Sequence, residues 1–455
     1  MLTTSYPEVL TAQLLFLALL PFVLFAAPRW AILAWLVMGN LDTTGGGTAV
    51  AESFGWMNAS KGFILPLYLW WRLRNVPGES LSTVPARLWL LLAFYAGLAC
   101  FWSPFPLAAA KMVGNMLGIL LTFAVLERAA RKGELSSRML SLLILASLGL
   151  GVLQTLVFKA YGFDGAGRPT RFSSFVTAQQ YAAFLVAFLA IVIRHPGFRS
   201  FGRILLASAL AVALVLNGSR TWFLGAIVVL LIYFWQLHAR AFAYSAFSLA
   251  TVAFGSLLAF NLNPNQGDPF DYASSRLTAT MAALMTGEDT PERSGLANLN
   301  FRFSVYDGAI SELSSASVVE LLGGHGTSSG GNVVMRVFPK SYPLEHLDPN
   351  RVVHNEWLRA LYEWGVLGFS LLLGAVATLS VGLLRRSKIP ATKFATMAAL
   401  SFLPAFVLAL STENVIAGAG NAVTMGLALL ISLSWSPQPA RSPRPNALYA
   451  PSSAH

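Results

Sequence analysis

The stretch from His354 to Gly368, HNEWLRALYEWGVLG, places a histidine and an asparagine where a hydrophilic segment turns into an apolar one. An imidazole titrates near neutral pH, so His354 could act as a general base or donate a hydrogen bond to a phosphate oxygen. The free N–H groups and positive dipole of a helix N-terminus also favour an anion. We therefore predict a proton-transfer site for an anionic substrate, with a capping or interfacial histidine as the alternative.

The spacing within this stretch predicts which residues share a helix face. Five of them recur at intervals of four and three residues and would face a neighbouring helix: His354, Leu358, Leu361, Gly365 and Gly368. Glu356, Arg359 and Glu363 lie three and four residues apart on the next face, where they can form ion pairs. Trp357 and Trp364 suit the aromatic belt at a membrane surface.

Three arginines lie in short polar segments beside apolar runs: Arg171 in RPTRFSSF, Arg220 in GSRTWFLG and Arg302 in NFRFSVYDG. A guanidinium group can hold phosphate oxygens in a bidentate manner. Each arginine alone is more simply explained by a side chain that snorkels to the membrane surface. On the same side of a membrane as His354, the three together predict a site for an anionic lipid headgroup.

Four further residues are secondary candidates for contacts in such a site. Asn355 and Arg359 closely follow the histidine in the chain. Asp42, in the segment GNLDTTGGGTAVAE, offers a carboxylate base, and Lys61 offers a further phosphate contact. The simpler interpretation of Asp42 is a turn residue in a loop. Because the chain has neither an Asp-x-Asp nor a His-Glu-x-x-His motif, we expect a metal-free site without a cofactor.

The elements that must position these residues are membrane helices. The chain has 455 residues, of which 55% are hydrophobic and 11% charged, whereas about a quarter of the residues in soluble domains are charged. Apolar runs long enough, or nearly long enough, to span a bilayer predict 12 or 13 transmembrane helices. The net charge of +11 comes from basic residues in short loops, which indicates topology signals rather than nucleic-acid binding. The single cysteine, Cys100, excludes an intrachain disulfide.

Basic clusters assign one set of loops to the cytoplasm by the positive-inside rule. The alternate loops are then external: 41–62, 104–106, 159–175, 218–220, 262–356 and 412–414. The chain divides into N-terminal transmembrane helices (1–261), a large periplasmic loop (262–356), C-terminal transmembrane helices (357–436) and a disordered cytoplasmic tail (437–455).

The large loop should contain ordered structure, because a structureless loop of this length is unusual. Its stretch 301–322 has the pattern of an amphipathic helix, whose buried side would comprise Phe301, Val305, Ile310, Leu313, Val318 and Leu321. The following GGHGTSSGGN, from Gly323 to Asn332, predicts a flexible turn or a backbone nest for an anion. The expected fold is an all-α polytopic membrane protein with one large loop that contains helices.

Several short stretches resemble the bacterial O-antigen ligase and O-antigen polymerase superfamily. HNEWLRALYEWGVLG is similar to its signature of His-Asn, nine residues, Gly, two residues and Gly, and GSRTWFLG is similar to its Ser-Arg-Thr turn. RPTRFSSFVTAQQYAAFL resembles its arginine-rich loop, although SFVTAQQ departs from the Gly/Asn-Pro-rich turn of many relatives. FRFSVYDGAISEL, followed by GGHG, resembles a segment of its large loop. The resemblance extends in layout over about residues 140–430.

The resemblance implies a glycosyltransferase of the bacterial inner membrane with its active site on the periplasmic face. Its donor would be a glycan on undecaprenyl diphosphate, and its acceptor a sugar of the lipid A core, as in lipopolysaccharide biosynthesis. In that family pattern His354 is the catalytic histidine, and Arg220 and Arg302 hold the diphosphate. Arg171 is a further contact to the diphosphate.

Other functions also fit the sequence. The same resemblance covers a polymerase that joins lipid-linked repeats into a longer polysaccharide. Whichever acceptor is used, Asp42 could replace His354 as the base, since some membrane glycosyltransferases use an early external carboxylate, often with a metal. A transporter of lipid or polysaccharide would belong to another class, but transporters often show inverted repeats and charges at the membrane midplane, and neither is clear in this chain.

Overall fold

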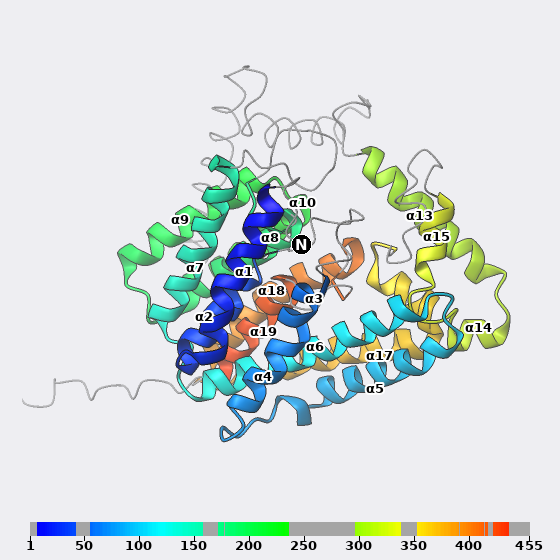
Figure 1. The fold of residues 1–455 in the computed structure, drawn as a ribbon, viewed down its shortest axis with the longest axis horizontal. Helices are drawn as coiled ribbons and strands as arrows, with labels where there is room; N and C mark the ends of the chain where they lie inside the picture. Colours follow the sequence, from blue (N-terminus) through cyan, green and yellow to red (C-terminus); the bar gives the residue numbers. More distant parts are fainter. Residues whose placement is uncertain are drawn as a thin grey trace, which may run out of the picture.

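The structure is a computed structural model, and it describes residues 7–41, 55–157, 172–176, 178–235, 296–337, 353–390, 392–413, 415–416 and 422–435. Within these ranges every regular element is a helix, and extended backbone pairs only where Leu41 meets Phe175 in a parallel bridge. Figure 1 shows the helices as one bundle with a smaller group of helices at its side. The predicted all-α fold is confirmed.

The described helices up to residue 157 include short 3₁₀ and π segments. Their bounds are α1 Pro7–Phe25, α2 Pro28–Met38, α3 Gly55–Ala59, π-helix Ser60–Ile64, α4 Leu65–Arg72, 3₁₀ turn Ser80–Ser82, α5 Val84–Leu98, 3₁₀ turn Ala99–Trp102, α6 Pro106–Arg131, α7 Ser137–Val152 and π-helix Leu153–Val157. Prolines at the first turns of α2, α4, α5 and α6 suit these starts, because the first N–H groups of a helix have no partner to lose.

The remaining helices carry the residues on which the sequence analysis concentrated. Their bounds are α8 Ala178–Arg194, α9 Ser200–Asn217, α10 Arg220–Trp235, α13 Leu296–Ser314, α14 Val318–Gly323, α15 Gly330–Val337, α17 Glu356–Arg386, α18 Lys393–Thr412, α19 Ala422–Ser432 and 3₁₀ turn Leu433–Trp435. Gly218 separates α9 from α10 with a φ of 64°, the left-handed conformation that glycine adopts at the end of a helix.

Six helical segments are long and apolar enough to cross a membrane: Val84–Trp102, Pro106–Arg131, Ser137–Thr155, Ser200–Asn217, Glu356–Arg386 and Lys393–Thr412. Shorter apolar helices pack among them: Val9–Phe25, Pro28–Met38, Gln179–Arg194, Thr221–Trp235 and Ala422–Trp435. The protein is therefore a multi-pass membrane protein. The predicted total of 12 or 13 spans stays a prediction, because the expected span over 241–261 lies outside the described residues.

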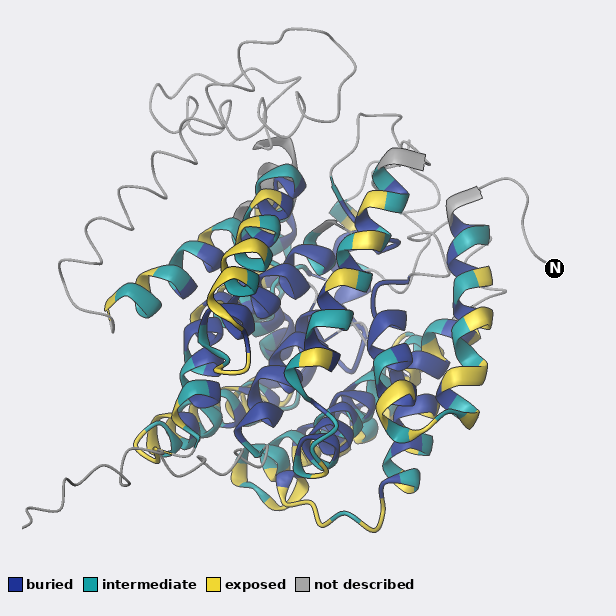
Figure 2. Cartoon of the chain, turned by 90° about the vertical axis from the view of Figure 1, so that its left-hand side faces the viewer, coloured by how far each residue is buried: buried dark blue, intermediate teal, exposed yellow. Residues whose placement is uncertain are grey.

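The core of the bundle is α8 together with α19. Every side chain from Tyr181 to Val192 is buried, and α8 contacts α9, α10, α18 and α19. The outer helices instead expose large apolar side chains, such as Phe94 of α5, Phe201 of α9 and Leu384 of α17. Figure 2 shows this as dark-blue helices inside and yellow patches outside. Exposed apolar side chains of this kind suit contact with lipid.

The loops gather at two opposite ends of the bundle, as the charge pattern predicts. At one end, which we call the external end, the described parts of the predicted external loops meet: Ser103 donates to the Thr327 carbonyl and Leu41 pairs with Phe175. At the other end, which we call the basic end, loops rich in arginine meet: Arg29 pairs with Glu134 at 3.4 Å. This grouping gives the relative sides of the loops, while the assignment to periplasm or cytoplasm stays a prediction.

The described part of the large loop forms α13, α14 and α15 beside the N-terminal part of α17 (Figure 1). The predicted single helix over 301–322 is wrong, because α13 ends at Ser314 and a capping box of Ser317 and Glu320 starts α14. Val305 is fully buried, as expected. The start of α14 changes the helix phase, and the expected burial fails there, because Val318 and Leu321 are exposed. Ile310 is exposed as well.

A break in α17 at Gly365 determines how the large loop is attached. Gly365 has φ 62° and ψ −167°, a conformation that side chains disfavour. In the turn before it, the carbonyls of Tyr362 and Glu363 accept hydrogen bonds from the backbone N–H groups of His325 and Gly326, each at 3.0 Å. The glycine-rich turn 323–332 therefore caps the broken helix.

This attachment predicts that Gly365→Ala destabilises the protein by about 3 kcal/mol or more, through backbone strain and a clash. A Cβ atom at Gly365 would lie 2.3 Å from the Leu322 carbonyl oxygen. Gly149→Ala is the matched control, because a Cβ atom at Gly149 in α7 meets nothing within 4 Å. Thermal unfolding in detergent should separate the two variants, and equal melting temperatures would contradict the proposed role of the break.

Candidate active site

His354 lies just before α17, with a φ of 58°. Asn355 is the N-cap residue, and its Oδ1 accepts the N–H groups of Trp357 and Leu358 at 3.1 Å each. The prediction that His354 and Gly365 share one face of a continuous helix is therefore wrong. The helix begins only at Glu356 and breaks at Gly365, so the histidine is displayed by the turn that precedes the cap.

The loop helix α13 contacts this histidine through a tyrosine and carries an arginine on the preceding turn. The Tyr306 hydroxyl donates to the His354 carbonyl at 3.0 Å. Arg302, one turn earlier, donates to the Thr412 carbonyl at 2.5 Å and lies 3.9 Å from the Glu413 carboxylate. We call Arg302, Tyr306, His354, Thr412 and Glu413 the histidine cluster. It joins three parts of the chain that are far apart in sequence.

The hydroxyl of Tyr306 stays protonated at neutral pH. Burial raises its pKa above the usual value, nearby Arg302 lowers it, and the Glu413 carboxylate raises it again. Tyr306 can therefore act as a hydrogen-bond donor that fixes the backbone of His354 against α13.

The start of α10 reaches the same cluster. The hydroxyl of Thr221 lies 3.4 Å from the hydroxyl of Thr412, and either can donate. Arg220 directly precedes Thr221 at the first position of α10, so its backbone lies beside the cluster. Its side chain is outside the described part of the structure.

A further row of contacts runs from the end of α9 through segment 172–176 to the first predicted external loop. The Asn217 side chain donates to the Phe172 carbonyl at 2.8 Å, and Phe175 pairs with Leu41. Lys61 is buried and donates to the carbonyl of Leu41. Two predicted candidates, Arg171 and Asp42, lie outside the described residues. Each is adjacent in sequence to a residue of this run of contacts.

The Arg359 side chain lies in a buried ion network and does not point into open space. It is 1% exposed, and it pairs with Glu356 at 2.9 Å and with Glu363 at 3.1 Å. This confirms the pairing predicted from the spacing. Glu356 also accepts the N–H of Ile416 at 2.7 Å, and Glu363 accepts the N–H of Ser328 at 2.8 Å. Arg359 thus holds the loop after α18 and the glycine-rich turn to one helix.

Two further expectations about this region are wrong. Trp364 is fully buried and donates to the Thr327 hydroxyl at 3.0 Å, so it does not belong to an interfacial belt. The glycine-rich turn is not an anion nest, because successive N–H groups from His325 to Ser328 already donate to protein oxygens. Both features serve the contact between the large loop and α17.

The sequence analysis missed Tyr306, Thr412 and Glu413 as site residues. Glu413 did carry a signal, since it is a charged residue in a predicted external loop of only three residues. Tyr306 follows Arg302 by four residues, which is one helical turn. Among the described residues, no three or more His, Cys, Asp or Glu side chains lie together in a way that could hold a metal ion.

Comparison with known protein families completes this description. Residues 204–373 match the sequence profile of the family described as O-antigen ligase. Over these residues, which are less than half of the chain, the protein is similar to the O-antigen ligase family. The matched range contains Arg220, Arg302 and His354. This similarity supports an O-antigen ligase-like function in polysaccharide biosynthesis, with lipid-linked glycans as the substrate class in a membrane environment. A search of curated proteins found no match.

The buried ion network predicts that Arg359→Met costs about 3–5 kcal/mol of stability, because the substitution leaves two buried carboxylates without their cation. The matched control is Arg336→Met, since Arg336 pairs with Glu312 on the surface and is 65% exposed. Its loss should cost about 1 kcal/mol or less. Chemical denaturation in detergent measures both values, and a cost for Arg359→Met as small as that of the control would refute the structural role of Arg359.

Proposed function

We propose that the protein is a glycosyltransferase that moves a glycan from undecaprenyl diphosphate to a hydroxyl group of an acceptor sugar. The observation that carries this proposal is the histidine cluster. His354 is joined to Tyr306, which lies one turn of α13 after Arg302. Arg302 in turn contacts Thr412, and Thr412 contacts the start of α10, where Arg220 lies.

The reaction needs one proton acceptor and several cations. The acceptor hydroxyl attacks the anomeric carbon of the donor glycan, the bond from that carbon to the diphosphate oxygen breaks, and the hydroxyl proton passes to the imidazole of His354. Negative charge grows on the leaving undecaprenyl diphosphate, and the guanidinium groups of Arg302 and Arg220 stabilise it. Alignment of the two substrates supplies much of the remaining rate enhancement, and no metal is required.

Arg171, Lys61 and Asp42 extend this site in the proposal. Lys61 is tied to Leu41, which neighbours Asp42, and Phe172, which neighbours Arg171, is tied to Asn217 near Arg220. Additional cations along this line would contact the diphosphate or the first sugar. Asn355 contributes by capping α17 and thereby setting the position of His354.

The external end is proposed to face the periplasm of the bacterial inner membrane. The histidine cluster lies at this end, whereas the arginine-rich loops meet at the basic end. The positive-inside rule places the basic end in the cytoplasm. Because the polar candidates gather at one end rather than at the membrane midplane, the arrangement favours surface transfer over transport.

The acceptor is proposed to be a core sugar of lipid A, which makes the protein a ligase. The second candidate, a polymerase, would use another lipid-linked repeat as the acceptor, and the matched superfamily includes both. Deletion of the gene distinguishes them on a polysaccharide gel. A ligase deletion abolishes attachment to lipid A, whereas a polymerase deletion leaves attached chains that are short.

In that deletion strain, His354→Ala and Arg302→Ala should reduce glycan transfer at least about 100-fold, because the first removes the base and the second a leaving-group contact. Arg336→Ala is the control, since this arginine lies on the surface of the same loop and pairs with Glu312. Protein amounts are measured by immunoblot. Full transfer by both site variants at normal amounts would rule out the proposed mechanism.

Glu413 should compete with the donor for Arg302, because its carboxylate lies 3.9 Å from the guanidinium group. Glu413→Gln is therefore expected to lower the KM for an undecaprenyl-diphosphate donor about two- to tenfold, in line with roughly 1 kcal/mol for a partly exposed ion pair. Steady-state kinetics of the purified protein tests this. An unchanged or raised KM would show that Glu413 does not act as a counter-ion to be displaced.

A further inference from the structure

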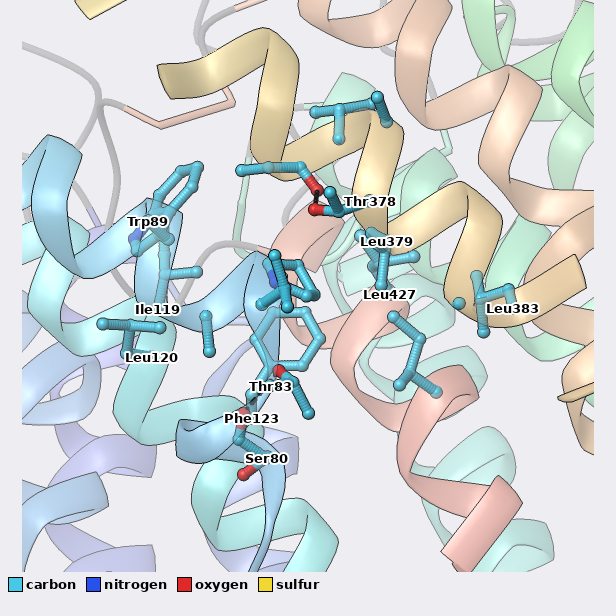
Figure 3. A pocket seen from close by; sticks show the side chains of 18 of the residues that line it. Ser80, Thr83, Trp89, Ile119, Leu120, Phe123, Thr378, Leu379, Leu383 and Leu427 are labelled. Carbon is cyan, nitrogen blue, oxygen red and sulfur yellow. Dashed lines mark hydrogen bonds between the residues drawn. The ribbon is translucent and has the colours of Figure 1, made fainter. Parts of the chain in front are cut away.

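A cavity of about 540 Å³ lies among α5, α6, α17, α18 and α19. Its lining includes Arg386 at the basic end, and also Val415 and Ile416, which lie close in the chain to Thr412 and Glu413 of the histidine cluster. Figure 3 shows that its walls are mainly apolar, with Trp89 of α5, Phe123 of α6, Leu379 of α17 and Leu427 of α19 among the labelled side chains. Some lining residues are exposed at its edge, including Val84 and Val381. The cavity is therefore a cleft that lipid can enter from the bilayer.

The cleft runs along the helices rather than across them. Its wall on α17 extends from Leu372 to Arg386, which is roughly 20 Å at about 1.5 Å per residue. One leaflet contributes about half of the hydrocarbon thickness of roughly 30 Å. The cleft is thus long enough for the acyl chains of a lipid in the leaflet that adjoins the basic end.

The basic end of the cleft is lined by Arg385 and Arg386, the last two residues of α17. Arg386 donates to the Ser434 hydroxyl at 3.3 Å and stacks over the Trp435 ring at 4.4 Å, and Arg385 is exposed. Ser80 and Thr83 also line this part of the cleft. The end therefore combines two cations with an aromatic ring, as the headgroup region of a membrane requires.

Nearby carboxylates do not neutralise this end. Glu127 is buried and already accepts the backbone N–H groups of Glu79 and Ser80 at 2.7 Å each, as well as the Arg131 side chain at 2.9 Å. Glu79 pairs with the same Arg131 at 3.2 Å. Arg385 and Arg386 thus leave a net positive charge at the mouth of the apolar cleft.

We propose that this cleft is a binding site for one anionic phospholipid, with its phosphate at Arg385 and Arg386 and its acyl chains along α17. The charge complementarity decides the occupant, because the phosphate group of the lipid carrier in the proposed transfer belongs to the opposite end of the bundle. Basic pockets between transmembrane helices on the cytoplasmic side bind anionic headgroups in this way. The choice of a phospholipid over the lipid carrier rests on the proposed function, whereas the positive charge of Arg385 and Arg386 at the cleft does not.

Such a lipid would stabilise the two helices that hold the large loop at the external end. The cleft separates parts of α5 and α17, and these two helices hold the glycine-rich turn: Tyr95 of α5 donates to the Gly323 carbonyl at 2.8 Å, and α17 accepts from His325 at 3.0 Å. A bound lipid would fill the cleft between these parts of the two helices, which pack directly against each other elsewhere.

Native mass spectrometry of the purified, delipidated full-length chain tests the site. The probes are phosphatidylglycerol and phosphatidylcholine with the same oleoyl chains, which differ only in the headgroup. The wild-type protein should retain one phosphatidylglycerol molecule with at least a tenfold preference. Arg385→Gln/Arg386→Gln should lose this preference, whereas Lys388→Gln/Lys393→Gln, which removes the same charge from exposed lysines outside the cleft, should keep it.

A second pair of variants tests the apolar part. Gly382 lines the cleft, and a Cβ atom there meets nothing within 4 Å, so Gly382→Leu fills the cleft without a clash. It should reduce phosphatidylglycerol retention at least tenfold, while Gly202→Leu, in equally open space on α9, should not. Three results would overturn the proposal. The two headgroups could be retained equally, phosphatidylglycerol retention could survive Gly382→Leu or the arginine substitutions, or the retained lipid could be a polyprenyl phosphate.

Discussion

The buried ion network around Arg359 is the constraint on which the external end depends. One guanidinium group is held between two carboxylates of the same helix, and each carboxylate has an oxygen left for a backbone N–H of another segment. The loop after α18 and the glycine-rich turn are thereby fixed to α17. Because charges buried in this way are costly unless every partner is in place, the network favours one arrangement of three segments over looser alternatives.

The break at Gly365 adds a second, neutral constraint next to this charged one. The freed carbonyls of α17 bind the large loop through its backbone, and the Thr327 side chain, which accepts from Trp364, adds to this attachment. The loop helices can then present Arg302 and Tyr306 to His354 from a fixed base. Gly365 thus acts through backbone conformation, whereas at Gly368 a Cβ atom would collide with the Trp364 side chain and contact Leu92 of α5.

Local features of this region could be predicted from the sequence. The spacing of Glu356, Arg359 and Glu363 was sufficient to predict their ion pairs, and the position of Asn355 before an apolar run fits its role as a cap. The all-α membrane fold followed from composition, and the grouping of loops at two ends followed from charge. These properties depend on residues close in the chain or on averages over many residues.

Other features required the three-dimensional structure. The positive φ of Gly365 interrupts a helical pattern that continues on both sides in the sequence, so periodicity alone predicts an unbroken helix. The meeting of Arg302 with Thr412 and Glu413 joins residues that are 110 positions apart, and no local pattern encodes such a contact. The pattern predicted for a single helix over 301–322 fails at Ser317, because a capping box there starts a second helix.

The burial of α8 from Tyr181 to Val192 has a consequence for biosynthesis. Two of the four helices that surround it, α9 and α10, follow it directly in the chain, but α18 and α19 are translated last. During synthesis, one side of α8 must therefore remain in contact with lipid or with the insertion machinery until the C-terminal helices arrive. Chains truncated before residue 393 would lack that cover and should be recognised by membrane quality-control proteases, even though every residue of the histidine and arginine signatures has already been made.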